Sequence, residues 1–239
     1  MSISNIVFDI VDNLNNNNIQ AVEEYNKKYN DTYGHYVLIK KLNQFIEKSN
    51  PTIMENAFDI KGLWYIPNYL SSNELIMLKE KIINEVELNP ISNKSSNSRR
   101  VAHYGYFYSY DKTGLKPAAP IPDFLKNLAT QSRIEQTVGG VWKHNNEFDQ
   151  VIINEYSFGQ QIAYHVDHTK LFGPIVACIT VGKAVPINFK LGDDIKTITI
   201  DEGSMYIMTA DARYKWQHGL KNNFEENRYS ITFRTINKN

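Results

Sequence analysis

Cysteine is nearly absent from this sequence, which holds only Cys178 among its 239 residues. A single cysteine excludes an internal disulfide, and its apolar neighbours Val176 and Ile179 indicate a buried strand position. No stretch reaches the roughly 20 apolar residues that cross a bilayer, and the N-terminus has no basic region followed by an apolar run. These absences predict a soluble intracellular protein, cytoplasmic or nuclear, with no membrane partner.

Net charge is absent as well, because 26 basic residues balance 26 acidic ones. Without a global positive field, any binding of nucleic acid has to come from a local patch. The hydrophobic share of 42% is ample for a folded core. We therefore expect a globular protein, and a monomer, that recognises its partners through local features.

The first 55 residues differ in pattern from the rest. Segments 19–29 and 35–45 carry apolar residues at approximately helical spacing, and Ser49-Asn50-Pro51 is a stop signal. We expect a helical extension over residues 1–55 and a main domain over residues 58–236. The extension could pack on the main domain, bind a partner, or hold nucleic acid through its lysines. Scattered lysines usually form a solvated face, which favours packing.

Short apolar segments separated by turns dominate the main domain. They span residues 148–156, 174–181, 186–191, 195–200 and 204–209. Many short strands punctuated by turns are typical of a β-sandwich or jelly roll. Two helices are expected before them, one capped by Ser71 or Ser72 and ending near Val86, and one from Pro122 to about Gln136. The predicted fold class is α+β.

His165-Val166-Asp167 places an imidazole and a carboxylate two residues apart. If this segment is extended, both side chains project to the same side. His218, far downstream, can supply a third ligand. Two histidines and one carboxylate leave coordination positions open for substrates, which is typical of non-haem Fe(II) oxygenases, although ligand identity alone also suits zinc.

The segment 228–234 has the alternation of a strand. It puts polar side chains on one face and apolar ones on the other. The polar face carries Arg228, Ser230, Thr232 and Arg234, and the apolar face carries Tyr229, Ile231 and Phe233. Two guanidiniums on one face indicate an anionic guest, because their planar forks suit carboxylates.

The order of these motifs resembles the AlkB family of iron- and 2-oxoglutarate-dependent dioxygenases. The motifs are Asn154-Glu155-Tyr156, His165-Val166-Asp167, His218-Gly219, and Arg228 with Arg234. The resemblance implies a double-stranded β-helix, a kind of jelly roll, with flanking helices. It implies Fe(II) held by His165, Asp167 and His218, with 2-oxoglutarate and O2 as cosubstrates. The implied 2-oxoglutarate contacts are Asn154, Tyr156, Arg228, Ser230 and Arg234.

The upstream segment 99–106 resembles the part of the family that forms a lid over the substrate base. The implied substrate contacts are Arg99, Arg100, His103, Tyr104 and Tyr106. Strand alternation would put Tyr104, Tyr106, Tyr108 and Tyr110 on one face. From the residues alone, each aromatic side chain can be strand core or a stacking surface for bases.

The activity that the resemblance implies is oxidative demethylation or hydroxylation of alkylated bases in DNA or RNA. The segment 213–219 is more similar to eukaryotic homologues that act on RNA or tRNA than to the bacterial DNA-repair enzyme. Two alternatives remain: the same chemistry on a protein side chain, and a non-catalytic nucleic-acid-binding protein retaining the fold. The complete ligand set and both arginines argue against the second, because a binding module needs none of them.

Overall fold

The computed structural model describes residues 53–92, 98–109, 114–139 and 147–237. The predicted helical extension over residues 1–55 lies almost wholly outside these ranges and stays a prediction. The described part begins with the short 3-10 helix η1 (Ala57–Asp59) and ends with strand β13 (Arg228–Ile236). In these ranges, no helix is both long and apolar enough to span a membrane.

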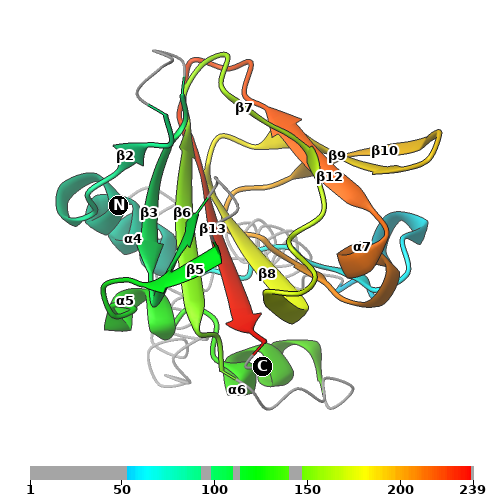
Figure 1. Cartoon of the computed structure of the whole chain (residues 1–239), viewed down its shortest axis with the longest axis horizontal. Helices are drawn as coiled ribbons and strands as arrows, with labels where there is room; N and C mark the ends of the chain where they lie inside the picture. The colour runs from blue at the N-terminus through cyan, green and yellow to red at the C-terminus, as the bar shows by residue number, and fades with distance from the viewer. Residues whose placement is uncertain (1–52, 93–97, 110–113, 140–146, 238–239) are drawn as a thin grey trace, which may run out of the picture. The chain divides into compact units, whose positions relative to one another are not determined.

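Two antiparallel sheets form the body of the domain (Figure 1). The larger sheet has seven strands in the order β1-β11-β8-β13-β6-β3-β2, and the smaller has four in the order β10-β9-β12-β7. The strands of the larger sheet, besides β13, are β1 (Leu63–Ile66), β2 (Asn89–Pro90), β3 (Arg100–Tyr104), β6 (Gln150–Tyr156), β8 (Phe172–Gly182) and β11 (Met205–Met208). The smaller sheet consists of β7 (Gln161–His165), β9 (Val185–Leu191), β10 (Asp194–Ile200) and β12 (Gln217–Lys221).

Alternation along the strands of the larger sheet creates two cores. In β1, Leu63 and Tyr65 point into a cluster shared with the smaller sheet, where Phe189 and Ile200 are buried. Successive side chains of a strand face opposite ways, so Trp64 joins a second cluster on the other face of the sheet. Two facing antiparallel sheets with a core between them confirm the predicted jelly-roll core.

Helices cover the outer face of the larger sheet. They are α4 (Ser72–Glu85), α5 (Asp123–Lys126) and α6 (Gln131–Val138), which bury Leu78, Ile82, Leu125 and Ile134 in the second cluster. Ser71 caps α4 as predicted, because its side chain accepts from the Glu74 N–H while Glu74 bonds back to the Ser71 N–H. The single helix expected from Pro122 to about Gln136 is instead two helices. Thr130 is extended between them and caps the second by accepting from the Arg133 N–H.

Gly105 overturns the predicted alternation of the tyrosines. Its φ is +74°, and a side chain there would collide with the Asp149 carbonyl oxygen. The chain turns at this glycine, so β3 ends at Tyr104 and β4 (Tyr106–Ser109) pairs in a separate small sheet with β5 (Gly114–Pro117). Tyr104 therefore packs on the helix-side core, and Tyr110 lies outside the described residues.

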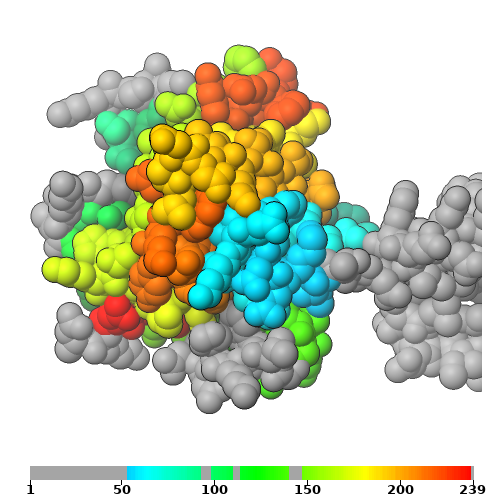
Figure 2. All heavy atoms as spheres, turned by 90° about the vertical axis from the view of Figure 1, so that its right-hand side faces the viewer, coloured from blue at the N-terminus to red at the C-terminus, as the bar shows by residue number. Residues whose placement is uncertain are grey.

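The start of the described chain packs against the edge of the smaller sheet formed by β10. Figure 2 shows β9 and β10 (gold) beside the first described residues (blue and cyan). Lys196 of β10 donates to the Phe58 carbonyl of η1 at 2.9 Å. Ala57 and Ile60 from this start are buried with Ile198 and Ile200 of β10 in the core between the two sheets.

Candidate active site

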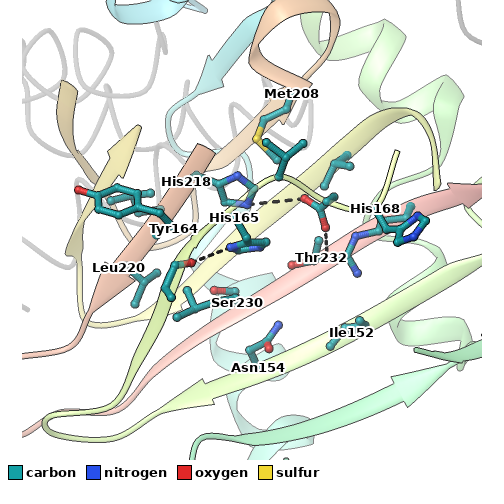
Figure 3. A pocket seen from close by; sticks show the side chains of 18 of the residues that line it. Ile152, Asn154, Tyr164, His165, His168, Met208, His218, Leu220, Ser230 and Thr232 are labelled. Atoms are coloured by element: carbon teal, nitrogen blue, oxygen red, sulfur yellow. Dashed lines mark hydrogen bonds and ion pairs between the residues drawn. The ribbon is translucent and has the colours of Figure 1, made fainter. Parts of the chain in front are cut away.

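The two histidines of the predicted ligand set are cross-strand neighbours. His165 ends β7 and His218 lies directly opposite it in β12. Their rings are 4.3 Å apart between centroids. Asp167 follows two residues after the end of β7, and its Oδ2 lies 3.6 Å from His218 Nε2 (Figure 3). One potential donor atom from each of the three residues falls within 4.8 Å of the other two.

Gly219 allows the two strands to approach so closely. A Cβ at this position would lie 2.9 Å from the Ile162 carbonyl oxygen and 3.1 Å from the Tyr164 nitrogen. The pairing of β12 with β7 also shifts register between His218 and Leu220. Glycine directly after His218 is therefore required by backbone packing, because any side chain would push β12 away from β7.

Electrostatics keep the candidate ligands in their metal-binding forms. Burial by itself raises the pKa of Asp167, but the guanidinium of Arg234 and then the imidazole of His218 bring that pKa well below its usual range. Burial and the nearby His165 lower the pKa of His218 to about 3, outweighing the opposite effect of Asp167. At neutral pH the site thus holds a carboxylate and a neutral imidazole, the forms that bind a metal.

Hydrogen bonds leave the inward atoms open for a metal. His165 Nδ1 lies 2.9 Å from the Ala163 carbonyl oxygen, which favours a proton on Nδ1 and leaves Nε2 as the donor. Arg234 binds Asp167 Oδ1, whereas Asp167 Oδ2 is buried and makes no hydrogen bond within the described ranges. A buried carboxylate oxygen without a donor is costly, and a cation between the three residues would remove that cost. The donor set therefore fits a non-haem Fe(II) centre.

Arg228 forms a second positive centre, and it is fully buried. Its guanidinium donates to the hydroxyl oxygens of Ser230 and Thr180, the latter at 3.0 Å, and stands 5.9 Å from the ring centre of Tyr156. Within the described ranges, no carboxylate oxygen lies within 4 Å of it. A buried cation with only hydroxyl partners is suited to an anionic ligand.

A cavity of about 360 Å³ lies between the two sheets beside the three candidate ligands, and Arg228 is not among the described residues that line it. Figure 3 shows Asn154 and Ser230 on the strands of the larger sheet, facing His165 and His218 across it. Of the residues predicted from the sequence, the cavity is lined by Arg99, Asn154, Tyr156, His165, Asp167, His218, Ser230 and Arg234. The set that the resemblance implied is thus largely gathered around one space.

Arg99 lies next to a predicted cosubstrate contact. Its Nε donates to Asn154 Oδ1 at 3.2 Å, and it lines the cavity. Arg99 was expected to contact the substrate from the lid segment. Its guanidinium is thus placed on the cavity wall beside Asn154.

The other four predicted substrate contacts are outside the lining of this cavity, as far as the described residues go. Arg100 turns away and pairs with buried Glu155, with Nη2 2.8 Å from Oε1. His103 packs against Phe107 with tilted rings whose centres are 4.5 Å apart, and it accepts at Nδ1 from the Tyr108 N–H. Tyr104 packs on the helix-side core, and the Tyr106 carbonyl accepts from Gln150. The turn at Gly105 instead brings Tyr108 to the cavity.

Several contributors to the site were not predicted. Gln150 accepts from Arg234 at 3.1 Å, and Thr180 accepts from Arg228. Tyr164, Met208 and Leu220 line the cavity. Strand alternation marks Gln150 as a neighbour of Asn154 on the same face, but only sheet pairing opposes Gln150 to Arg234 and Thr180 to Ser230.

Comparison with known proteins identifies the chain's relatives. A profile of the 2OG-Fe(II) oxygenase superfamily matches residues 62–234. The chain is 29% identical over 178 residues to tRNA (carboxymethyluridine(34)-5-O)-methyltransferase ALKBH8 of Macaca fascicularis, covering 74% of this chain and 26% of that protein. It is 28% identical over 202 residues to an uncharacterised protein of Acanthamoeba polyphaga mimivirus, covering 77% of this chain and 90% of the viral protein. The solved structure of OsALKBH1 superposes with a TM-score of 0.56 at 12% identity, covering 73% of this chain and 96% of that one.

The matched region runs from just before β1 into β13 and contains all three candidate ligands. The chain belongs to the 2OG-Fe(II) oxygenase superfamily. Within that superfamily it is an AlkB-type dioxygenase that uses Fe(II), 2-oxoglutarate and O2. The chain spans about a quarter of the length of the ALKBH8 relatives from Macaca fascicularis and Xenopus tropicalis. The methyltransferase activity in their names therefore describes those longer proteins.

Proposed function

We propose that this dioxygenase oxidises a C–H bond on an alkylated base in nucleic acid, so that the base is demethylated or hydroxylated. His165, Asp167 and His218 would hold the metal, since their donor atoms converge and the lowered pKa values of Asp167 and His218 keep those two groups deprotonated at neutral pH. Fe(II), when bound with 2-oxoglutarate and O2, supplies the oxidation of the C–H bond, and 2-oxoglutarate leaves as succinate and CO2. If the oxidised carbon is a methyl on nitrogen, the product can release formaldehyde.

The buried guanidinium of Arg228 is the observation that carries the cosubstrate assignment. It lies behind Tyr156 and Ser230, which line the cavity, and has two hydroxyl partners. The distal carboxylate of 2-oxoglutarate would give this cation an anionic partner, because a guanidinium suits a carboxylate. Asn154 and Ser230 offer neutral hydrogen-bonding groups on the same wall.

Arg234 and the apolar wall prepare the metal end of the site. Arg234 fixes the Asp167 carboxylate through Oδ1 and is itself oriented by Gln150. This leaves Oδ2 directed at His218 and fixes which oxygen can reach the metal. Ile187 and Leu220 line the cavity beside the histidines and exclude water from the reacting C–H bond.

Nucleic acid as the substrate is supported by the aromatic and cationic side chains of the cavity wall. Tyr108, Tyr164 and Arg99 line the cavity and are not fully buried, and Tyr164 is 40% exposed. Aromatic rings stack on bases, and a guanidinium can pair with phosphate or stack on a base. The names of the relatives agree with this class: a tRNA methyltransferase in Macaca fascicularis and an "Alkylated DNA repair protein ALKBH8 homolog" in Arabidopsis thaliana. We favour RNA, because three ALKBH8 relatives named for tRNA match the chain at 28–29% identity, against 21% for the plant protein.

The test is a single-turnover reaction of the full chain, loaded with Fe(II) and 2-oxoglutarate without oxygen and then exposed to O2. Each substrate is one oligonucleotide sequence made four ways, as RNA and as DNA, with and without a methylated base. Succinate and oligonucleotide mass are followed in the same samples. We expect loss of a methyl mass, or gain of one oxygen, with one succinate per event and only on methylated strands.

The His165→Ala variant is the control, because it removes one metal ligand and leaves the surface that binds nucleic acid. It should give neither succinate nor a mass change. Succinate from the wild type with every oligonucleotide unchanged would refute the nucleic-acid substrate and favour a protein side chain as the target. Substrate oxidation by the alanine variant at the wild-type rate would refute the assigned centre.

A further inference from the structure

Arg213 is a buried cation whose hydrogen bonds, among the described residues, all go to backbone carbonyls, and its guanidinium also lies 5.0 Å from the ring centre of Tyr214. It lies in α7 (Ala210–Tyr214) and its side chain is almost wholly inaccessible. Nη1 donates to the carbonyl of Asp167 at 2.8 Å, Nη2 to that of Phe172 at 3.1 Å, and Nε to that of Gly173 at 3.0 Å. Over the described ranges, no carboxylate oxygen comes within 4 Å of this guanidinium.

The three carbonyls belong to the two ends of one connection. It leaves β7 after His165, carries Asp167, and enters β8 at Phe172. The backbone of Arg213 precedes β12, the strand that carries His218. One side chain therefore ties the segment of the carboxylate ligand to the segment of the second histidine.

Burying a charge is costly, so the arrangement needs a reason beyond stability. An apolar side chain could fill the same space but could not bind three carbonyls at once. The planar guanidinium, with its fixed fork of N–H donors, holds them in one relative position. Lysine keeps the charge but presents a single ammonium on a flexible stem, so it cannot hold all three with the same geometry.

We propose that Arg213 is a positioning residue that sets the distance between Asp167 and His218, and thereby the affinity of the site for its metal. This inference rests on the metal site proposed above. Metal–ligand distances tolerate deviations of only about 0.2 Å, so a small drift of the connection weakens coordination. Groups that orient metal ligands typically change metal affinity by about 10- to 100-fold when they are removed.

The test measures Mn(II) binding to the full chain by calorimetry, together with the Tm in the absence and presence of Mn(II). The variants are Arg213→Lys, which keeps the charge, and Arg213→Gln, which keeps two N–H donors without the charge. Arg133→Lys is the matched control, because Arg133 also donates to a backbone carbonyl, that of Tyr69, and stacks on an aromatic ring. Arg133 lies in α6, on the helical layer away from the candidate metal site.

We expect Arg213→Lys to raise the Kd for Mn(II) by about 10- to 100-fold and to shrink the Mn(II)-induced rise in Tm. Arg133→Lys should lower the Tm and leave the Kd within about twofold of wild type, as a mutation remote from the ligands does. A lower Tm with an unchanged Kd in Arg213→Lys would overturn the positioning role while the metal site stands. If the lysine variant does not fold, the same comparison is made with Arg213→Gln. No Mn(II) binding by the wild-type chain would refute the metal site itself.

Discussion

Replacing Gly219 by alanine tests whether backbone contact between β12 and β7 brings the metal ligands together. The added Cβ would lie 2.9 Å from the Ile162 carbonyl oxygen and 3.1 Å from two backbone atoms of the next residues. Carbon contacts are most favourable at about 3.5 to 4.0 Å, so the strands have to separate by roughly 0.5 to 1 Å. Overpacking of this kind costs about 1 to 3 kcal/mol of folding free energy.

The larger effect is on metal affinity, because His218 immediately precedes Gly219 and pairs with His165 across the strands. A separation of this size exceeds the roughly 0.2 Å tolerance of metal–ligand distances. We expect Gly219→Ala to weaken Mn(II) binding by at least about 10-fold, the lower end of what lost ligand orientation costs. Its free energy of unfolding should fall by no more than the overpacking cost of about 1 to 3 kcal/mol.

The assay is Mn(II) calorimetry beside urea unfolding of the metal-free chain. Lys221→Ala is the control, because Lys221 is an exposed residue of the same strand and pairs with Gln161 of β7. The control should match wild type in both measurements. Wild-type Mn(II) affinity in Gly219→Ala would refute the reasoning, since the two strands would then tolerate a side chain without displacing the histidines.

Three further predictions concern the charged groups of the site. Arg228→Gln should raise the KM for 2-oxoglutarate by about 10²- to 10³-fold, because charge-assisted hydrogen bonds contribute about 1.5 to 3 kcal/mol each. The KM is measured from the rate of succinate formation at a series of 2-oxoglutarate concentrations. An unchanged KM would show that Arg228 is not part of the cosubstrate site. Arg234→Met should destabilise the metal-free chain by about 3 to 5 kcal/mol, since it leaves the buried Asp167 carboxylate without its ion-pair partner. Mn(II) should restore part of the lost Tm by supplying a new cation, and an unaffected Tm would contradict the pairing. Burial, followed by the charges of Arg234 and Arg99, lowers the pKa of His103 from its ordinary value of 6.5 to about 4. His103 therefore contributes stability that is fully present above pH 6.5 and is lost as the pH falls towards 4. In His103→Asn the amide oxygen can replace Nδ1 as the acceptor for the Tyr108 N–H. Urea unfolding between pH 7 and 4 should show a smaller loss of unfolding free energy in this variant than in wild type, and an equal loss in both proteins would contradict the prediction.

Local sequence patterns predicted most of what lies on single strands. The two-residue period of segment 228–234 separated Arg228 and Arg234 from Ile231 and Phe233, and the latter pair is buried in the helix-side core. Alternation succeeds there because both faces of β13 are packed and the strand continues without a break. The same rule was wrong for residues 104–110, where Gly105 turns the chain into another sheet.

The candidate ligands show a similar limit. Extended geometry was expected to direct His165 and Asp167 to one side, and both do line the cavity. The strand, however, ends at His165. The position of Asp167 therefore depends on Arg213 and Arg234, which reach it from distant parts of the chain. Neither contact follows from spacing, because each joins Asp167 to a residue far away in the sequence, one through the backbone carbonyl and the other through the carboxylate.

The sequence by itself determined the class of fold and the chemical type of the site, because residue periodicity and an ordered set of ligands are local properties. Only the tertiary structure decided that Arg99 reaches Asn154, that Arg100 turns to Glu155, and that β12 lies against β7 at Gly219. These facts depend on which strands pair and in what register. Register is set by packing summed over the whole core, and no single segment encodes it.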